Sequence, residues 1–466
     1  MGRIICVGGG IVGLCGATML ALDGHDVTVL ERDLATPSLP DKAWDEWKRR
    51  GVNQFRMIHL FLARFREVAD VELPGLTAAM VEAGALRMNP LVGIPDAITG
   101  GWRDGDERFE SVTARRPVAE SVVAAFAAGT PGVTIRRGVA VAGLLTTVGR
   151  DGIVHVTGVR TDAGEEIPAD LVVDAGGRRS SVPAWLRDAG SPGPEEMIDD
   201  CGFVYYGRHF RSADGSVPPA FGGLLQPYGS VSMLTLPADN GTWGVGVITS
   251  SKDAALRGLL DASCWERVVR AYPLVAHWAD AEPITDVQLM AKIEDRQRTY
   301  VVDGAPVATG IVPLADAWAC SNPSLGRGIS IGIMHAAALR SLLREVSVDD
   351  PHALAMRWAE LTAEHVEPLF ADTLGFDRHR LAEIEAVIAG RPYETDDPEW
   401  NLGNALATSV MSDPDLLRGF MAVASVLERG VDVLSRPGIA ERAIAAADPT
   451  PLPGPDRNEL LALVGE

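Results

Sequence analysis

The chain has 466 residues, of which 42 are Lys or Arg and 63 are Asp or Glu, so its formal net charge is −21. Such a chain does not have the basic surface with which nucleic-acid-binding proteins displace counterions, nor the polybasic segments that bind anionic lipids. Its length and its hydrophobic fraction of 47% favour a globular protein of two or three lobes, because single cores rarely grow beyond about 250–300 residues.

The five cysteines stand at positions 6, 15, 201, 264 and 320, and no two of them have Cys-x-x-Cys spacing. We therefore expect no metal site, and we expect reduced thiols in the cytoplasm. The N-terminus has no signal-peptide pattern, and no run of about twenty apolar residues appears, so neither a leader nor a membrane span is predicted.

Three glycines near the N-terminus form a nucleotide-binding pattern. Gly8, Gly10 and Gly13 lie between a predicted strand over 3–7 and a predicted helix over 14–23. Gly8 permits a tight turn, Gly10 lets the backbone approach a pyrophosphate, and Gly13 lets the helix pack closely on the sheet. The alternative is a glycine-rich turn without a nucleotide, which the strand and helix context makes much less probable.

A second predicted strand, over 26–31, ends at Glu31 and is followed by Arg32. A carboxylate at this position can accept hydrogen bonds from both hydroxyls of an adenosine ribose, and it repels a 2′-phosphate. The pattern therefore favours FAD or NAD over NADP at this site.

Three later stretches fit a flavin. Arg115 and Arg116 open a predicted helix that runs through Phe126, where a basic pair is unfavourable for the helix dipole unless an anion is present. An apolar strand over 169–174 ends at Asp174 and enters a glycine turn.

The third stretch follows a strand that ends near Leu314. Asp316 can hold a ribityl hydroxyl, and the N–H groups around Gly326 and Gly328 can stabilise negative charge on the N1/C2=O edge of a flavin. An apolar helix is predicted from Ile329 to Leu343.

These four stretches resemble the FAD-dependent monooxygenase superfamily of the para-hydroxybenzoate hydroxylase fold, over about residues 1–345. That superfamily includes aromatic hydroxylases, epoxidases, flavin halogenases and geranylgeranyl reductases. The resemblance implies an α/β fold with a discontinuous Rossmann-like FAD-binding domain, an inserted antiparallel substrate sheet and a C-terminal helical region. It implies the following cofactor-binding residues: Gly8, Gly10, Gly13, Glu31, Arg32, Arg115, Asp174, Asp316, Pro323, Gly326, Gly328 and Ile329.

Two departures from the family pattern stand out. Ala315 replaces the usual glycine before Asp316, and Ala175-Gly176-Gly177 replaces Asp-Gly after Asp174. The second departure weakens the case for a role of this segment in docking a nicotinamide. No second Gly-x-Gly-x-x-Gly is present, which fits a family whose reductant binds without its own Rossmann domain.

A basic segment over 49–59 resembles the Gly-x-Pro-Gln-x-Arg-x-x-His stretch of some family members, with Asn53 in place of proline. Arg56 and His59 are therefore candidates to face the flavin, and with Pro323 they are the candidate catalytic residues. A loop whose basic side chains pair with the acidic surface is the alternative.

Alternating runs over 203–211, 230–236 and 242–249 predict an antiparallel sheet, which in the family holds substrate over the flavin. Tyr205, Tyr206 and His209 are candidate pocket residues by location, although alternation places some of them on each face. The aromatic residues at 265, 272 and 278 are expected in the core.

The predicted domains follow from these segments. Residues 1–70, 110–185 and 296–345 form the FAD-binding domain, residues 71–109 and 186–295 the substrate domain, and residues 346–466 a helical region. Asp350-Pro351 and Asp413-Pro414 predict helix starts in this last region, which packs on the substrate domain and can act as a pocket lid.

The resemblance implies a monooxygenase that inserts one oxygen atom from O₂ into a small organic molecule through a flavin C4a-hydroperoxide, by hydroxylation or epoxidation, in secondary metabolism. FAD is the expected cofactor and NADH or NADPH the reductant, with a separate flavin reductase as an option. The substrate, the reductant and the choice between monomer and homodimer stay open.

Three alternatives were weighed. A flavin halogenase needs a lysine between flavin and substrate, and none of Lys42, Lys48, Lys252 and Lys292 lies in a flavin stretch, nor is there a Trp-x-Trp. A hydrolase is suggested by Gly-x-Ser-x-Gly at Ser330, but this serine is expected inside a helix and not at a nucleophile elbow. A non-catalytic flavin-binding protein is the third alternative.

Overall fold

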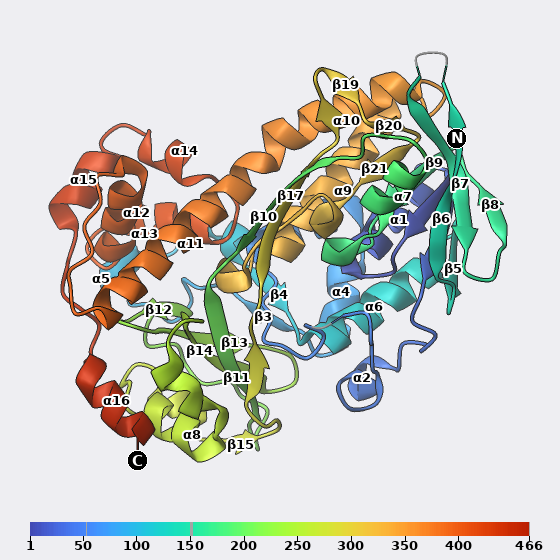
Figure 1. Ribbon diagram of the computed structural model, residues 1–466. Helices are drawn as coiled ribbons and strands as arrows, with labels where there is room; N and C mark the ends of the chain where they lie inside the picture. The colour runs from blue at the N-terminus through green and yellow to red at the C-terminus, as the bar shows by residue number, and fades with distance from the viewer. Residues whose placement is uncertain (53, 150–151, 466) are drawn as a thin grey trace.

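The computed structural model describes residues 1–52, 54–149 and 152–465. A five-stranded parallel sheet with the order β21-β9-β1-β2-β5 forms its upper right part in Figure 1. Its strands come from distant parts of the chain: β1 Arg3–Val7, β2 Asp26–Glu31, β5 Val133–Arg137, β9 Leu171–Asp174 and β21 Ile311–Pro313.

Three helices pack on this sheet and form the largest apolar core with it: α1 (Ile11–Leu22), α6 (Arg116–Ala128) and α9 (Gly328–Glu345). Helix α1 is buried along almost its whole length, which explains why it is apolar on all sides and shows no polar face. Its first residue follows the glycine turn directly, so the helix N-terminus points at whatever that turn binds.

Shorter elements complete this part of the molecule. One antiparallel sheet contains β6 (Val141–Val148), β7 (Val154–Thr161) and β8 (Glu166–Pro168), and β20 (Ala308–Thr309) adds to β7 in parallel; β3 (Leu86–Met88) pairs with β4 (Ser111–Thr113), and β18 (Val301–Val302) with β19 (Ala305–Pro306). The connecting helices are α2 (Pro40–Glu46), α3 (Ala63–Glu72), α4 (Leu76–Glu82), α5 (Asp96–Thr99) and α7 (Val182–Asp188).

A second large sheet is antiparallel and is inserted in the chain between β9 and β21. It has the order β12-β13-β14-β11-β15, and β16 also pairs with β11. Its strands are β11 (Phe203–Arg211), β12 (Leu225–Pro227), β13 (Ser232–Pro237), β14 (Thr242–Ser250), β15 (Glu282–Pro283) and β16 (Gln288–Met290). Helix α8 (Ala262–Arg270) and the segment after it cover one face. Trp265 in the helix and Tyr272 and Trp278 behind it are buried there, so these aromatics belong to the core as expected.

Two long strands join the two sheets. Strand β10 (Glu195–Asp200) pairs with β17 (Glu294–Thr299), which also pairs with β22 (Ala319–Cys320), and Figure 1 shows this ribbon running from the parallel to the antiparallel sheet. The chain thus leaves the parallel sheet through β10 and returns through β17.

The C-terminal part is helical, as predicted. It contains α10 (Pro351–His365), α11 (Glu367–Ile388), α12 (Pro398–Ser409), α13 (Pro414–Ala424), α14 (Gly430–Leu434), α15 (Ile439–Ala446) and α16 (Arg457–Gly465). Asp350, Asp397 and Asp413 cap helices that begin with proline, and their carboxylates accept hydrogen bonds from backbone N–H groups of the first turn.

The fold class is therefore mixed α/β, as the sequence indicates, while the domain boundaries stay a prediction. None of the described helices combines the length and apolar character that a membrane crossing requires.

Candidate functional site

One cavity of about 2080 Å³ runs between the parallel sheet, the antiparallel sheet and the C-terminal helices. Typical pockets for a single small ligand measure about 300–1,000 Å³, so this cavity has room for a large cofactor and a second molecule. We call the part around residues 8–13 and Glu31 the nucleotide end, and the part between Arg327 and helices α11–α14 the helical end.

The glycine turn at the nucleotide end has the geometry that its pattern predicts. Gly8 has φ +116°, and a Cβ there would lie 2.3 Å from the carbonyl oxygen of Ala175. A Cβ on Gly13 would lie 2.3 Å from the carbonyl oxygen of Gly8, whereas a Cβ on Gly10 would meet no protein atom within 4 Å. Gly8 and Gly13 are thus required by the protein's own packing, and the space at Gly10 is open to a ligand.

Glu31 lies at the end of β2 within a buried network of charges. Its carboxylate accepts hydrogen bonds from the N–H groups of Gly9 (3.0 Å) and Asp33 (2.9 Å), and from the guanidinium of Arg49. Arg49 also donates to Glu120 at 2.5 Å. A carboxylate has about four lone-pair sites, so Glu31 can still accept from a ligand hydroxyl.

Glu120 on α6 is shared by two arginines, because Arg116 donates to it at 2.7 Å in addition to Arg49. Burial alone would raise the pKa of Glu120, but the guanidinium groups of Arg116 and Arg49 outweigh burial and hold this pKa below its usual value. Arg49, which sequence reasoning did not single out, is therefore the cation that makes two buried carboxylates tolerable.

The two arginines before α6 have different surroundings. Arg115 is buried and bound to Asp239 through its backbone N–H and its guanidinium, at 2.7 Å for the closest contacts, and it lies over the ring of Trp44. It does not line the cavity, whereas Arg116 does. The sequence predicted that Arg115 faces the cofactor, but in the structure Arg116 is the one of the two arginines that lines the cavity.

Asp174 ends β9 and lines the cavity, but its carboxylate is engaged by the protein. It accepts hydrogen bonds from the N–H of Gly176 (3.0 Å) and the hydroxyl of Ser180 (2.5 Å). Burial raises its pKa against the effect of these bonds. Its main structural role is to shape the turn after β9.

Asp316 has the opposite character. It follows Leu314 at the end of the neighbouring strand, its side chain is open to the cavity, and no hydrogen bond to it comes from the described residues. Burial deep in the molecule raises the pKa of Asp316, while Arg116 and Arg178 act in the other direction. This is an acceptor without a protein donor, directed at the ligand space.

Ala315, at the position where the resembling proteins have glycine, has a strained backbone conformation. It has φ +51°, in the left-handed region that glycine adopts freely, and its N–H donates to Nδ1 of His335 at 3.1 Å. Left-handed backbone costs an L-residue about 1–2 kcal/mol. The turn that presents Asp316 is therefore kept despite this cost.

The loop before α9 borders the cavity through Pro323, Gly326, Gly328 and Ile329. Gly326 has φ +65°, and a Cβ on either Gly326 or Gly328 would meet no protein atom within 4 Å. The backbone at the start of α9 is thus bare toward the cavity, as a flavin edge would require.

The basic segment over 49–59 contributes only one of its two candidates. His59 lines the cavity, while Arg56 does not and instead donates to the carbonyls of Asp45 (3.4 Å) and Trp47 (3.3 Å). The sequence predicted that Arg56 faces the ligand space, but in the structure its side chain lies outside the cavity lining. Asn53 lies outside the described residues.

His59 has defined partners at both ring nitrogens. Nδ1 lies 2.8 Å from the carbonyl of Met57, and Nε2 lies 3.4 Å from the guanidinium of Arg116. Because the first is an acceptor and the second a donor, these partners select the neutral tautomer with the proton on Nδ1. Burial and Arg116 lower the pKa of His59 to about 4, so this ring orients Arg116 as a neutral acceptor.

None of the three pocket candidates on β11 lines the cavity, in contrast to the expectation from the sequence. Tyr206 faces the core under α8, and Tyr205 packs between the sheet and α11, where its hydroxyl donates to Asn322 at 2.7 Å. His209 is buried against Trp44, and burial lowers its pKa to about 3. Strand β11 is covered by α8 on one face and by α11 on the other, whereas residues of β12 and β13 reach the cavity.

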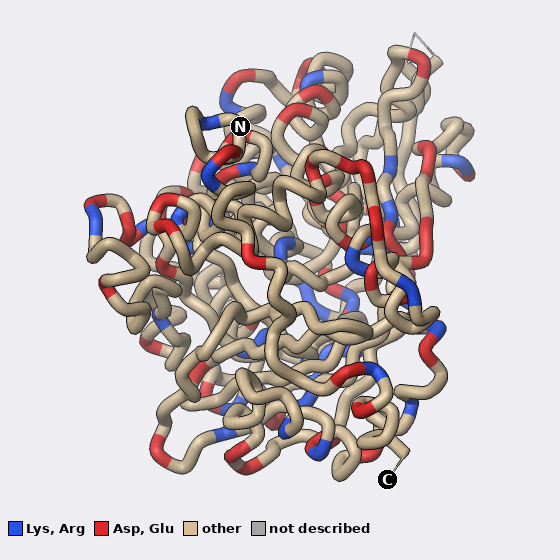
Figure 2. Tube along the Cα trace, turned by 90° about the vertical axis from the view of Figure 1, so that its left-hand side faces the viewer, with Lys and Arg blue, Asp and Glu red and all other residues tan. Residues whose placement is uncertain are grey.

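Arginines line the cavity in nearly the same number as carboxylates, although the chain as a whole is strongly acidic: Arg32, Arg49, Arg87, Arg116, Arg178, Arg179, Arg327, Arg380 and Arg429. Figure 2 shows basic positions in the middle of the molecule, while acidic positions recur along its outline. The lining of the cavity is therefore close to neutral, in contrast to the strongly acidic chain as a whole.

FAD fits these residues. The open space at Gly10 and at the α1 N-terminus suits a pyrophosphate, Glu31 suits a ribose, Asp316 is an unused acceptor, and the bare loop at Gly326–Gly328 leaves room for a ring edge.

No family model matches the sequence. Protein Rv3254 from Mycobacterium tuberculosis is 28% identical to the chain over 473 residues, which cover 95% of this chain and 93% of that protein.

Several solved structures share the fold. PqsL, a probable FAD-dependent monooxygenase from Pseudomonas aeruginosa, has a TM-score of 0.59 and 16% identity, covering 82% of this chain and 99% of PqsL. The flavin-dependent halogenase CmlS has a TM-score of 0.60 and 16% identity, covering 93% and 78%. The anhydrotetracycline hydroxylase OxyS from Streptomyces rimosus has a TM-score of 0.58 and 20% identity, covering 92% and 76%. The resemblance to the FAD-dependent monooxygenase superfamily is thus confirmed for the fold.

Proposed function

We propose that the protein is an FAD-dependent monooxygenase that inserts one oxygen atom from O₂ into a small organic substrate, with NADH or NADPH as reductant. The observation that carries this proposal is the convergence of distant segments on one cavity. The glycine turn, Glu31, Asp316 and the Gly326–Gly328 loop all border it.

Each part of FAD has a matching group in the protein. The turn over 8–13 would hold the pyrophosphate, Glu31 the adenosine ribose, Asp316 a ribityl hydroxyl, and the N-terminus of α9 the ring edge where negative charge develops. When bound, FAD supplies the transfer of electrons from the nicotinamide to O₂.

The chain itself has to bind, orient and exclude water. Arg116 is held between Glu120 and the neutral ring of His59, so its guanidinium is fixed toward the space near Asp316. The apolar side chains at the helical end keep water from the reacting region. In this arrangement Pro323 and His59 shape the site, and no proton transfer by them is required.

Two alternatives are less well supported. A halogenase of this fold needs a lysine between flavin and substrate, and no lysine of the described residues lines the cavity. For a hydrolase, Ser330 would have to stand at a turn, but it lies buried in α9.

The test is incorporation of ¹⁸O from ¹⁸O₂ by the flavin-loaded protein. PqsL has been crystallised with 2-aminobenzoylacetate, so small aromatic compounds are the first substrates to screen for stimulated NAD(P)H oxidation. Label in the product supports the proposal. Products that carry no label, formed with full NAD(P)H consumption, contradict it, and a protein purified without flavin contradicts the cofactor assignment.

The cytoplasm is the proposed location. The five cysteines are all buried and unpaired, as expected for a protein kept in a reducing compartment.

A further inference from the structure

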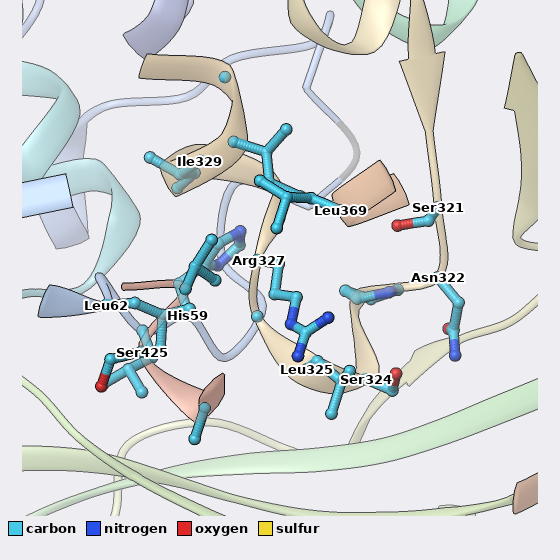
Figure 3. Close-up of a pocket in the computed structure, with 18 of the residues that line it drawn as sticks. His59, Leu62, Ser321, Asn322, Ser324, Leu325, Arg327, Ile329, Leu369 and Ser425 are labelled. Carbon is cyan, nitrogen blue, oxygen red and sulfur yellow. The ribbon is translucent and has the colours of Figure 1, made fainter. Parts of the chain in front are cut away.

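Arg327 is a cation at the helical end of the cavity, between the two bare glycines of the loop before α9. Figure 3 shows its side chain among Leu325, Ile329 and Leu369. Among the described residues it forms one long hydrogen bond, from Nη1 to the hydroxyl of Thr373 at 3.5 Å, and its Nε has no partner. The planar fork of this guanidinium is thus largely unused.

Two carboxylates of the facing helix α11, Asp372 and Asp377, accept their hydrogen bonds from residues other than Arg327. Asp372 is held by Arg429 through two hydrogen bonds, at 2.8 and 3.0 Å. Asp377 accepts from the hydroxyl of Ser324 at 2.5 Å, and burial raises its pKa to about 7 despite this bond. Arg327 thus forms no salt bridge with a described carboxylate, and burial lowers its pKa although the nearby charges of Asp372 and Asp377 act to raise it.

A partly buried guanidinium that forms no salt bridge with the protein is costly, and a ligand that supplies a carboxylate would lower this cost. Arginine presents parallel N–H donors that match the two oxygens of a carboxylate. Because the chain has a net charge of −21, an anionic ligand is attracted only where a local cation overcomes the general repulsion. The helical end offers such a cation at Arg327.

Apolar side chains form part of the walls at the helical end, beside charged residues such as Asp372 and Arg429. Leu369 and Phe376 from α11, Leu406 from α12 and Phe420 from α13 line the cavity there. Val426, which also lines it, has φ +59°, a genuine outlier for a β-branched residue, and its carbonyl accepts from Nε of Arg64 at 2.9 Å. Backbone strain of this kind is typical of segments that a ligand site requires.

We propose that the second ligand of this cavity is an apolar organic acid. Its carboxylate pairs with the guanidinium of Arg327, and its hydrocarbon body lies against helices α11–α13. This inference rests on the proposed function for the reaction that follows, but the binding itself does not depend on turnover.

The experiment uses the FAD-loaded full chain and a matched pair of probes, 2-naphthoate and its neutral amide 2-naphthamide, with affinities measured by calorimetric titration. We expect the wild type to bind the acid at least tenfold more tightly than the amide. In Arg327→Met, which keeps an unbranched stem but removes the guanidinium, this preference disappears through weaker acid binding, while amide binding is unchanged. Arg327→Lys keeps the charge without the fork and retains a smaller preference.

Arg436→Met is the control, because this exposed arginine lies in the same helical part outside the cavity lining and changes the net charge equally. It should keep the wild-type preference. Equal or absent binding of the two probes to the wild type overturns the proposal, and so does an unchanged preference in Arg327→Met with lower flavin content, which would assign Arg327 to the cofactor. A failure of oxygen insertion with the acid preference intact would overturn only the proposed function.

Discussion

The nucleotide end and the helical end of the cavity are lined by different kinds of groups. At the nucleotide end, backbone without side chains meets the ligand space, and the charges of Glu31, Arg49 and Glu120 compensate one another. At the helical end, apolar side chains of α11–α14 line the cavity together with charged ones, and Arg327 forms no salt bridge with a described carboxylate. A site lined by backbone suits one invariant ligand, such as a cofactor. A site lined by side chains can acquire a different ligand specificity through substitution of those side chains.

The largest effect is expected from breaking the charge compensation at the nucleotide end. Arg49→Met leaves Glu31 and Glu120 buried without their shared cation, which typically costs about 3–5 kcal/mol. Thermal and denaturant unfolding measure this loss. Arg3→Met, at an exposed ion pair with Asp170, is the control and should change stability by about 1 kcal/mol or less.

The same network predicts how stability depends on pH. The folded protein holds the pKa of Glu120 below its usual value, so this group stabilises the fold above about pH 4.5, and the contribution is lost as pH falls through the lower folded value. Arg49→Met should reduce this acid sensitivity. An equal loss of stability on acidification in the variant would contradict the assignment.

A pair of glycine substitutions separates folding from cofactor binding. Gly13→Ala places a methyl 2.3 Å from the Gly8 carbonyl and should destabilise the protein by about 1–3 kcal/mol or more. Gly10→Ala meets no protein atom, so the flavin-free protein should unfold at the wild-type temperature while the flavin content after purification falls. Full flavin retention in Gly10→Ala would show that no pyrophosphate lies against this turn.

At the helical end, Asp377 contributes to stability with a pH dependence opposite to that of Glu120. The pKa of Asp377 is raised to about 7 in the folded protein, so this group stabilises the fold at low pH and the contribution is lost as pH rises from about 4 to 7. The change is on the order of a few kcal/mol. Asp377→Asn mimics the neutral acid and should flatten the stability curve in this window; a slope equal to that of the wild type would contradict the prediction.

Asp316→Asn tests the acceptor between the two ends. Since a hydrogen bond to a charged group contributes about 1.5–3 kcal/mol, the variant should retain FAD about tenfold more weakly, measured by fluorescence as FAD is released. Glu360→Gln, at an exposed surface carboxylate, is the control. Unchanged FAD affinity in Asp316→Asn would remove Asp316 from the cofactor site.

The smallest expected effect is an increase in stability. Ala315→Gly relieves the left-handed backbone at φ +51°, and the relief of about 1–2 kcal/mol is partly offset by the greater freedom of glycine in the unfolded chain. The net gain in the free energy of unfolding should be up to about 1 kcal/mol, which differential scanning calorimetry resolves. A lower melting temperature would show that the methyl is needed for packing.

The sequence predicted the secondary structure at the nucleotide end well, because each element there is encoded by a short, continuous stretch of residues. Strand, glycine turn, helix and terminal Glu31 lie within one short stretch, and β2 has the predicted bounds of Asp26–Glu31. Local patterns could not tell Arg115 from Arg116, since which of two neighbouring side chains faces the cavity depends on how α6 is rotated against Asp239 and Glu120.

The sequence alone therefore determined the α/β fold class and the order of the segments that line the cavity, because periodicity and glycine spacing act over a few residues. Only the tertiary structure decided that β11 is covered on both faces, that Arg49 compensates two distant carboxylates, and that Arg327 faces α11 without a salt bridge to a described residue. These properties arise from contacts between segments up to hundreds of residues apart, and no local pattern records such contacts.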